Sequence, residues 1–330
     1  MLNQKKKSVL LIVLFFVITY CVLYVIGIAL TPKNKELIKT YRTIESRSIF
    51  VEDNDTLDVL VVGHSGVLYG FAPMEMYDET GITSFNLART TQSPIEAYNA
   101  IVEVLNYQSP KVIVLNVDEF TYDKADNLAK IGALAALNTV FPIFNVHTRW
   151  KYAFTNDECI PKSLTKNHVV SFTRKPIKSM DKYNRHMTPT DKVHKIIKPW
   201  EKYLNKINDL CIERGIALVL MEIPTTTFWS YKRYNGFKNF ADEKGLTFFD
   251  LNQVEEIGID WTQDTCDKGD HMNIYGARKV TSYMAKYLRD TYDLESHKGE
   301  EKYASWDQDL DLYRQTYGGI EEVWEILQTF

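Results

Sequence analysis

The sequence reads Val59-Leu60-Val61-Val62-Gly63-His64-Ser65 at the start of its globular part. The valine-rich run before the glycine is short and apolar, which predicts a buried β-strand. The strand breaks at Gly63 and presents Ser65 at its end. A serine becomes a nucleophile when a base takes its proton and an acid orients that base. A histidine and an acid are therefore expected elsewhere in the chain.

Apolar runs and helical patterns alternate in the rest of the chain. The helices are marked by a capping box, Ser93 to Glu96, by a glycine stop at Gly215, and by apolar residues at helical spacing. Strands that are apolar nearly throughout and alternate with helices predict a mostly parallel sheet covered on both faces. The predicted strands are 57–62, 83–87, 112–117, 216–223 and 246–251, and the clearest helices lie within 93–105, 200–211 and 277–288.

The expected histidine stands late in the chain, in Asp267-Lys268-Gly269-Asp270-His271-Met272-Asn273. Ligands of parallel α/β sheets bind outside the carboxyl ends of the strands, where Ser65 and Asp118 would both lie. Ser65 and His271, with Asp270 or Asp267 as the acid, are therefore predicted to form one hydrolase-type site.

Of the two acids, Asp270 is expected to lie nearer the second imidazole nitrogen of His271. It would sit near the positive end of the helix that begins close to Asn273, and would stay ionised there. Gly269 leaves the other outcome open, because a tight turn at this glycine could fold the carboxylate of Asp267 back.

Gly63-His64-Ser65-Gly66 also matches part of the nucleophile elbow G-x-S-x-G of α/β-hydrolases. Val67 replaces the last glycine of that motif, and Ser65 follows the first strand of the domain, whereas the elbow serine follows several strands. The elbow is the weaker interpretation.

The motifs taken together resemble the SGNH (GDSL-like) hydrolase superfamily, which has Gly-Asp-Ser after its first strand and a late Asp-x-x-His. The similarity is greatest to membrane-anchored members, the teichoic-acid D-alanine transfer and alginate O-acetylation proteins. It covers roughly 57–288 without an insertion, and implies a three-layer α/β/α, flavodoxin-like fold. The motifs of that branch are Phe71-Ala72-Pro73, Ser84-Phe85-Asn86-Leu87 and His271-Met272-Asn273 with Gly276-Ala277.

The resemblance implies acyl transfer through a serine ester, with His271 taking the proton of Ser65. Backbone N–H groups at Ser65 and Gly66 would bind the oxyanion. The side chain of Asn86 is a further candidate donor, although a turn residue bonded to its own backbone is an equal alternative.

Two departures from the family leave its chemistry open. Lys268 occupies the position of the family's acid, three residues before the histidine, and the family's Gly-x-Asn-Asp block is missing where the chain has Asn116-Val117-Asp118-Glu119. Two functions follow. One is a serine esterase or O-acyltransferase acting on a cell-surface polysaccharide or glycopolymer. The other is a non-catalytic accessory protein on the same scaffold that partners an integral-membrane acyltransferase.

Composition bears on the partners and cofactors of the protein. The 330 residues carry a formal net charge of −4 and contain no basic block with interleaved aromatic residues, which argues against nucleic acid as a partner. The four cysteines show neither metal spacing nor a disulfide framework, and Cys211 is expected to be a free buried thiol. No metal and no cofactor are predicted.

The N-terminus predicts a membrane anchor. Residues 8–30 contain no charged residue, and a span needs about 20 apolar residues. A cleaved signal peptide is the alternative, with Gly27-Ile28-Ala29 as a weak cleavage site. Basic residues flank the span on both sides, and the tail Lys5-Lys6-Lys7 favours a cytoplasmic N-terminus with the globular part outside.

The expected organisation is therefore a cytoplasmic tail and single-pass anchor over 1–30 and a linker over 31–55, followed by an α/β domain over 56–294. The domain is interrupted by an insertion of about 122–199, which is expected to lie over the strand ends with locally bonded histidines. A C-terminal extension, 295–330, is expected to pack on the domain as a helix.

Overall fold

The computed structural model describes residues 4–30, 48–90, 92–121, 154, 166–177 and 187–318. The chain divides into two compact units. One unit spans 1–47 and 126–161, and the other spans 48–125 and 162–330. The predicted linker 31–55 and the predicted insertion 122–199 lie mostly outside the described residues.

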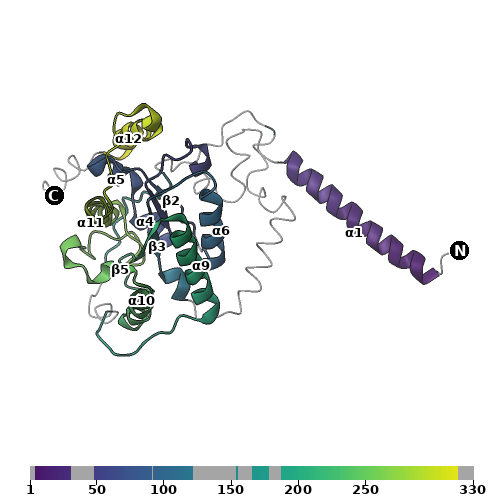
Figure 1. Ribbon diagram of the computed structural model, residues 1–330, viewed down its shortest axis with the longest axis horizontal. Coiled ribbons are helices and arrows are strands. Elements are labelled where there is room, and N and C mark those ends of the chain that lie inside the picture. Colours follow the sequence, from purple (N-terminus) through teal and green to yellow (C-terminus); the bar gives the residue numbers. More distant parts are fainter. Residues whose placement is uncertain are drawn as a thin grey trace. The chain divides into compact units, whose positions relative to one another are not determined.

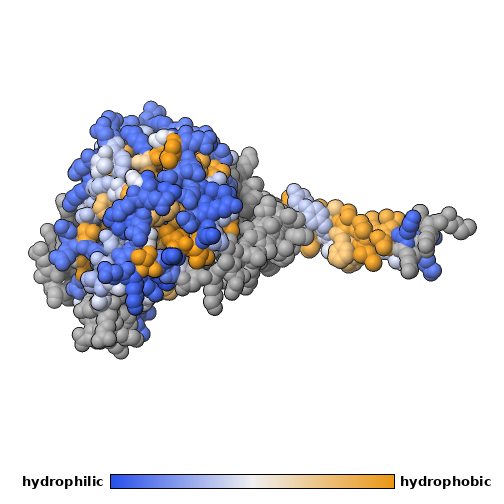
Figure 2. Space-filling model, turned by 60° about the horizontal axis from the view of Figure 1, so that its bottom comes forward, coloured by the Kyte–Doolittle hydropathy of each residue, from blue (hydrophilic) through white to orange (hydrophobic). Residues whose placement is uncertain are grey.

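In the first unit the described part is almost entirely helix α1, Gln4–Ala29. This helix is long and apolar enough to cross a membrane, a property that an N-terminal signal sequence shares. Its large apolar side chains are exposed, and Figure 2 shows hydrophobic residues over most of its length. The prediction of a membrane-length apolar helix is confirmed.

The second unit is built on a five-stranded sheet in which every pairing is parallel, in the order β2-β1-β3-β4-β5. This is the flavodoxin-like order: β2 is added on one side of β1, and β3, β4 and β5 are added in turn on its other side. All five predicted strands are confirmed, each within two residues of its predicted ends. Their bounds are β1 Val59–Val62, β2 Ser84–Asn86, β3 Val112–Asn116, β4 Ala217–Glu222 and β5 Thr247–Asp250.

Helices cover both faces of the sheet, which confirms the three-layer α/β/α architecture. In Figure 1, α6 and α9 lie side by side on one face, and α4, α5 and α11 lie on the other. The bounds are α4 Ser65–Gly70, α5 Pro73–Thr80, α6 Pro94–Val104, α9 Lys198–Arg214, α10 Tyr231–Lys244, α11 Ile274–Tyr292 and α12 Ala304–Tyr317. Short 3₁₀ turns are η1 Ser48–Val51, η2 Asp118–Thr121, η5 Leu251–Gln253, η6 Glu255–Ile257 and η7 Glu301–Tyr303.

Local chemistry explains why these helices begin and end where they do. The Ser93 hydroxyl and the Glu96 carboxylate cap α6 reciprocally, as the capping box predicts. Helix α9 ends at Gly215, whose φ of +66° belongs to the left-handed region that glycine enters at no steric cost. The side chain of Asn273 accepts hydrogen bonds from the backbone N–H groups of Tyr275 and Gly276 and so begins α11.

The sheet core joins the elements that carry the candidate site. Val59, Val61 and Val114 are fully buried in one apolar cluster with residues of α4 and α11. Burial of a Val or Leu side chain contributes about 1.5–3 kcal/mol, so the positions of β1 and α11 relative to each other are well determined. The C-terminal extension adds α12, whose Trp306, Leu310 and Tyr313 are buried and which packs on α5 as expected.

Candidate active site

Ser65 is presented by a tight turn between β1 and α4. Gly63 closes the turn because a Cβ at this position would lie 2.6 Å from Val67 Cγ2 and 2.8 Å from Asn116 Cβ. Only glycine allows the strand end to approach α4 and β3 this closely. The next two residues, His64 and Ser65, therefore leave the carboxyl end of β1 at a defined angle.

His271 is held by the loop that precedes α11. Lys268 and Gly269 both have positive φ, +75° and +93°, and a Cβ at Gly269 would lie 2.3 Å from Thr226 Oγ1. The carbonyl oxygen of Gly269 accepts a hydrogen bond from the Thr226 backbone N–H at 2.8 Å. The loop is thus fixed against the segment that follows β4, and it directs the imidazole of His271 toward Ser65.

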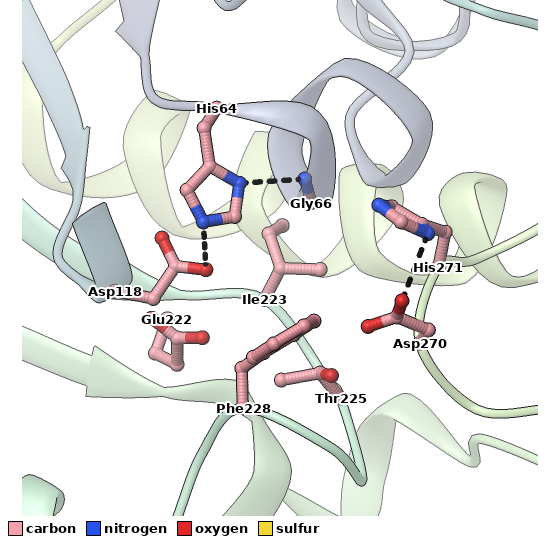
Figure 3. Close-up of a pocket in the computed structure, with 9 residues that line it drawn as sticks. All are labelled: His64, Gly66, Asp118, Glu222, Ile223, Thr225, Phe228, Asp270 and His271. Carbon is pink, nitrogen blue, oxygen red and sulfur yellow. Dashed lines mark hydrogen bonds and ion pairs between the residues drawn. The ribbon is translucent and has the colours of Figure 1, made fainter. Parts of the chain in front are cut away.

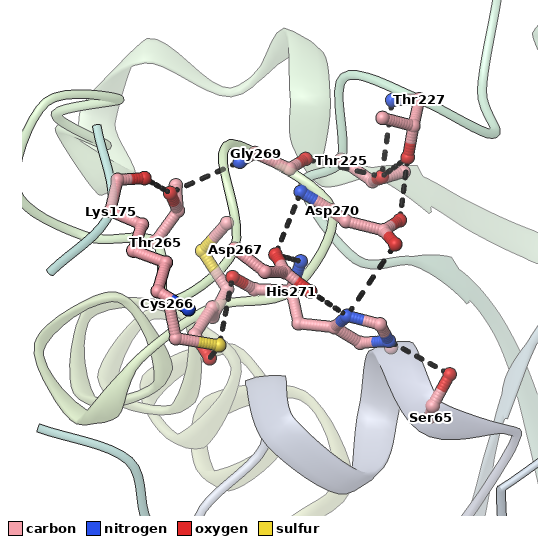
Figure 4. Close-up of polar contacts among 12 residues, drawn as sticks. Ser65, Lys175, Thr225, Thr227, Thr265, Cys266, Asp267, Gly269, Asp270 and His271 are labelled. Atoms are coloured by element: carbon pink, nitrogen blue, oxygen red, sulfur yellow. Dashed lines mark hydrogen bonds and ion pairs between the residues drawn. The ribbon is translucent and has the colours of Figure 1, made fainter. Parts of the chain in front are cut away.

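The structure brings Ser65 and His271 together across 206 residues of sequence, as predicted. His271 Nε2 lies 2.9 Å from Ser65 Oγ, and Nδ1 lies 2.5 Å from Asp267 Oδ2 (Figure 4). In this arrangement Asp267 fixes the tautomer with the proton on Nδ1, which leaves Nε2 free to accept the serine proton. The ring of Tyr69 packs against the imidazole, with the two ring centroids 5.0 Å apart.

The prediction that Asp270 lies nearer to His271 than Asp267 does is wrong. Asp270 Oδ2 is 3.7 Å from Nδ1, and its other oxygen accepts a hydrogen bond from the Thr227 hydroxyl at 2.5 Å. The two positive-φ residues turn the chain so that Asp267 also accepts the backbone N–H groups of Asp270 and His271, at 3.1 and 2.7 Å. The N-terminus of α11 is capped by Asn273, so the helix end does not hold Asp270 in place.

Asp267 and His271 stabilise each other's charged forms. Burial alone would lower the pKa of His271, but the hydrogen bond and charge of Asp267 outweigh burial, and the pKa is raised. Burial in turn would raise the pKa of Asp267, yet its hydrogen bonds with His271 lower it. Asp267 therefore stays ionised beside an imidazole whose protonated form it stabilises.

Asp267, Asp270 and His271 place potential metal-ligand atoms within 4.8 Å of one another. The group does not suit a metal ion as it stands, because Ser65 and Asp267 engage both ring nitrogens of His271. With a proton on Nδ1 and a serine on Nε2, the imidazole has no lone pair left for a metal. These three side chains are arranged for proton transfer rather than for metal binding.

Of the two alternatives for Asn86, the oxyanion donor is wrong, and the residue bonded to nearby backbone is the one found. Its amide nitrogen donates to the carbonyl oxygens of Val67 and Phe71, at 2.9 and 3.1 Å, and its oxygen accepts from the backbone N–H of Ala88. Asn86 is fully buried and ties β2 to α4. Both N–H bonds of the amide are used, so none is left for a substrate.

The other predicted donor, the Gly66 N–H, is also engaged in this structure, because it donates to His64 Nδ1 at 3.1 Å. Among the described residues, the backbone N–H of Ser65 is the remaining predicted donor and has no acceptor. The site as it stands is therefore poor in oxyanion donors.

Two residues of the site were missed by sequence reasoning. His64 Nδ1 lies 3.5 Å from Ser65 Oγ, and its Nε2 is 2.5 Å from Asp118 Oδ2. Tyr69 packs on His271. A signal for His64 existed, since a histidine stands where the resembled family has aspartate, and Asp118 follows the neighbouring strand.

The described part of the predicted insertion also lies against the site. Asn167 donates to the carbonyl oxygen of Ala88 at 2.8 Å, and the Val169 N–H donates to that of Leu68 at 2.9 Å. His168 is fully buried with Nε2 3.3 Å from the carbonyl oxygen of Tyr69, and burial lowers its pKa to about 4. His168 is a locally bonded neutral histidine, as expected.

Comparisons with known proteins add little at the level of sequence. No family model matches the chain, and no curated protein matches it either. Solved structures with a similar arrangement include a GDSL-like lipase from Bacteroides thetaiotaomicron, which is 9% identical with a TM-score of 0.35. The match covers 71% of this chain and 88% of that one.

Two further matches are named as esterase or acylhydrolase. A catalytic mutant of an acetylxylan esterase from Geobacillus stearothermophilus is 11% identical over 72% of this chain and 95% of that one, with a TM-score of 0.33. A lipase/acylhydrolase from Enterococcus faecalis is 9% identical over 73% and 98%, with a TM-score of 0.32. Identities and TM-scores this low leave the function of this chain to be inferred from its own residues.

Proposed function

We propose that the protein is a serine esterase or O-acyltransferase, anchored by α1, that acts on a cell-surface glycan or glycopolymer. The observation that carries the proposal is the continuous contact from Ser65 Oγ through His271 to Asp267, at 2.9 and 2.5 Å. This is the geometry in which a histidine can take the serine proton while a carboxylate stabilises the resulting charge.

The geometry weighs against the alternative of a non-catalytic accessory protein. That alternative would be favoured by a serine and histidine too far apart for one hydrogen bond, with neither aspartate on the imidazole. Here both contacts are short enough for direct hydrogen bonds. Lys268, which occupies the family's acid position, does not remove the acid from the site, because Asp267 reaches His271 from one residue further away.

A small cavity lies beside the site and limits what can enter it. It has room for about one water-sized group, about 10 Å³, and His64, Gly66 and His271 line one part of it. Ile223 and Phe228 supply apolar walls (Figure 3). A space of this size excludes a long acyl chain and admits one atom of the reacting group, such as its carbonyl oxygen.

A fluorophosphonate probe tests the proposed nucleophile. The probe is expected to phosphonylate Ser65 in the full chain, with the modified peptide identified by mass spectrometry, because His271 activates this hydroxyl. Ser93→Ala is a matched control, since Ser93 also begins a helix but belongs to a capping box without an imidazole. Labelling should persist in Ser93→Ala and disappear in Ser65→Ala. Labelling that survives in Ser65→Ala contradicts the proposal.

The same preparation separates hydrolysis from transfer. With p-nitrophenyl acetate as acyl donor, an esterase releases acetate, whereas a transferase acetylates an added oligosaccharide. Mass spectrometry of the products distinguishes the two activities.

Membrane attachment through α1 is tested separately. The full chain is expected to stay with the membrane fraction after extraction at alkaline pH, because α1 exposes apolar side chains over a membrane-spanning length. Replacing Leu14 and Val17 by arginine places two charges near the helix centre, at about 2.5–3.5 kcal/mol each, and should release the protein. Retention of the double variant, or release of the unsubstituted chain, would contradict the anchor.

Protease added to cells without their wall should digest the globular part if it lies outside.

A further inference from the structure

Ser65 lies between two histidine–aspartate pairs, of which only the His271 pair is used by the proposed function. The second pair is His64 with Asp118. His64 follows β1 and is only 8% exposed, and Asp118 begins η2 beyond β3. His64 Nε2 lies 2.5 Å from Asp118 Oδ2 (Figure 3). His64 Nδ1 lies 3.5 Å from Ser65 Oγ.

The two histidines are placed for different tasks. His271 Nε2 is 2.9 Å from Ser65 Oγ, which is the better position for a base. His64 Nδ1 is further from the hydroxyl and faces the backbone N–H of Gly66 at 3.1 Å. Nδ1 of His64 therefore lies beside the N–H groups that an oxyanion on Ser65 would need.

The site lacks other donors for that oxyanion. The amide of Asn86 is used within the fold, and the Gly66 N–H is held by His64 itself. Removing one oxyanion donor from a serine enzyme typically costs about 2.7–4 kcal/mol of barrier. While His64 accepts the Gly66 N–H, a serine enzyme built on these residues needs a donor beyond the Ser65 N–H.

In this structure His64 Nδ1 accepts the Gly66 N–H, and Asp118 on the other ring nitrogen makes it easier for His64 to take a second proton. Burial alone would lower its pKa, but the charge and hydrogen bond of Asp118 outweigh burial and raise it, with a smaller contribution from Asp270. Glu222, on β4, also lines the cavity, and burial raises its pKa well above the ordinary value, which favours its neutral form. His271 also lines the cavity; its pKa is raised overall, and the charge of His64 opposes that rise.

Protonation changes what His64 can do. Nδ1 then carries a proton and can no longer accept the hydrogen bond of the Gly66 N–H. Instead Nδ1 becomes a charged donor 3.5 Å from Ser65 Oγ, and the Gly66 N–H is released as a second donor. Hydrogen bonds from a charged donor are about twice as strong as neutral ones.

We propose that His64, charged and oriented by Asp118, is a catalytic residue that donates from Nδ1 to the oxyanion formed on Ser65. The inference rests on the proposed function. In the step concerned, Ser65 Oγ bonds to the acyl carbon, the carbonyl π pair moves onto oxygen, and the serine proton passes to His271 Nε2. The intermediate then collapses, and the departing oxygen takes the proton from His271. His64 keeps its own proton throughout.

The small cavity supplies the place for this oxygen. His64, Gly66 and His271 line it together, and its volume of about 10 Å³ suits one oxygen-sized group. Figure 3 shows the His64 ring and the His271 ring on either side of Gly66 and the start of α4.

Two variants test His64 against a purely structural role as the helix cap. Ser is a good N-cap residue, so His64→Ser keeps an acceptor for the Gly66 N–H but cannot carry a charge. Asp118→Asn keeps His64 but removes the charge that raises its pKa. Both are assayed with p-nitrophenyl acetate from pH 5 to 9, with melting temperature and fluorophosphonate labelling of Ser65 as controls for folding.

The rate of the unsubstituted protein is expected to fall as pH rises through the pKa of His64, because the donor proton is lost. In His64→Ser this alkaline limb should disappear and kcat should fall about 10²–10³-fold, with KM changed much less. In Asp118→Asn the limb should move to lower pH. A cap-only role would leave the pH profile of both variants unchanged, and that result overturns the inference.

Failure of the inference and failure of the proposed function give different results. If Ser65 of the unsubstituted chain does not react with the probe, the proposed function is contradicted and this inference with it. If Ser65 reacts and the alkaline limb is the same in all three proteins, this inference alone is contradicted. If His64→Ser fails to fold, the ring ¹⁵N signals of His64 are measured in the phosphonylated protein instead. An Nδ1 without a proton at every pH from 5 to 9 would also contradict the inference.

Discussion

Ser65→Ala is expected to reduce acyl transfer by about 10⁶-fold, the loss seen when the nucleophile of a serine enzyme is removed. Ser65 Oγ is the atom that His271 Nε2 contacts at 2.9 Å, and no second hydroxyl of the described residues contacts that nitrogen. The measurement is kcat with p-nitrophenyl acetate. Because Ser65 is partly exposed and does not belong to the apolar core, the melting temperature should change little.

The sharper form of this test uses the double variant Ser65→Ala/His271→Ala. Groups that act as one unit are strongly non-additive, so each single variant should lose about as much activity as the double one. If the loss of activity in the double variant equals the product of the two single losses, Ser65 and His271 act independently. That result would contradict the serine–histidine mechanism even if each residue proved necessary.

Asp267→Asn is expected to reduce kcat about 10⁴-fold, and Asp270→Asn less than about tenfold. Asparagine keeps the shape of Asp267 but cannot stabilise the protonated imidazole, and it can hold His271 in the wrong tautomer. Asp270 is the matched control because it is the same residue type on the same loop, 3.7 Å rather than 2.5 Å from Nδ1. The reverse ranking of the two variants would show that the loop rearranges when substrate binds.

The Asp267 variant should also change the pH profile. Catalysis needs neutral His271, so the rate falls as pH drops through the pKa of this histidine. Asp267 raises that pKa, and its neutralisation should therefore shift the acid limb to lower pH. Asp270→Asn removes a smaller contribution to the same pKa, so its acid limb should shift less.

Local signals were sufficient for most of the fold. The five strands follow from short apolar runs, since a strand buried on both faces needs no partner to be recognised in sequence. The start of α6 follows from the hydrogen bonds between Ser93 and Glu96, and the end of α9 from Gly215, because caps depend on residues only a few positions apart.

The pairing of Ser65 with His271 was also predictable, although they lie 206 residues apart. Each residue is marked locally, Ser65 by the strand that ends before it and His271 by the helix that begins after it. A parallel sheet then brings the carboxyl ends of its strands to one edge, where such residues meet. The order of the elements and the parallel topology together predict that Ser65 and His271 lie close, although the sequence gives no distance between them.

The sequence alone determined a parallel α/β sheet, a membrane-length N-terminal helix and a serine–histidine pair, because each depends on patterns within one element or on the order of elements. The tertiary structure decided the finer contacts. Asp267 rather than Asp270 reaches His271 because Lys268 and Gly269 adopt positive φ angles, and Asn86 is used up by the carbonyls of α4. His64 meets Asp118 because β1 and β3 are neighbours in the sheet. Contacts of this kind depend on side-chain directions to within an ångström, which no spacing of residues in a sequence specifies.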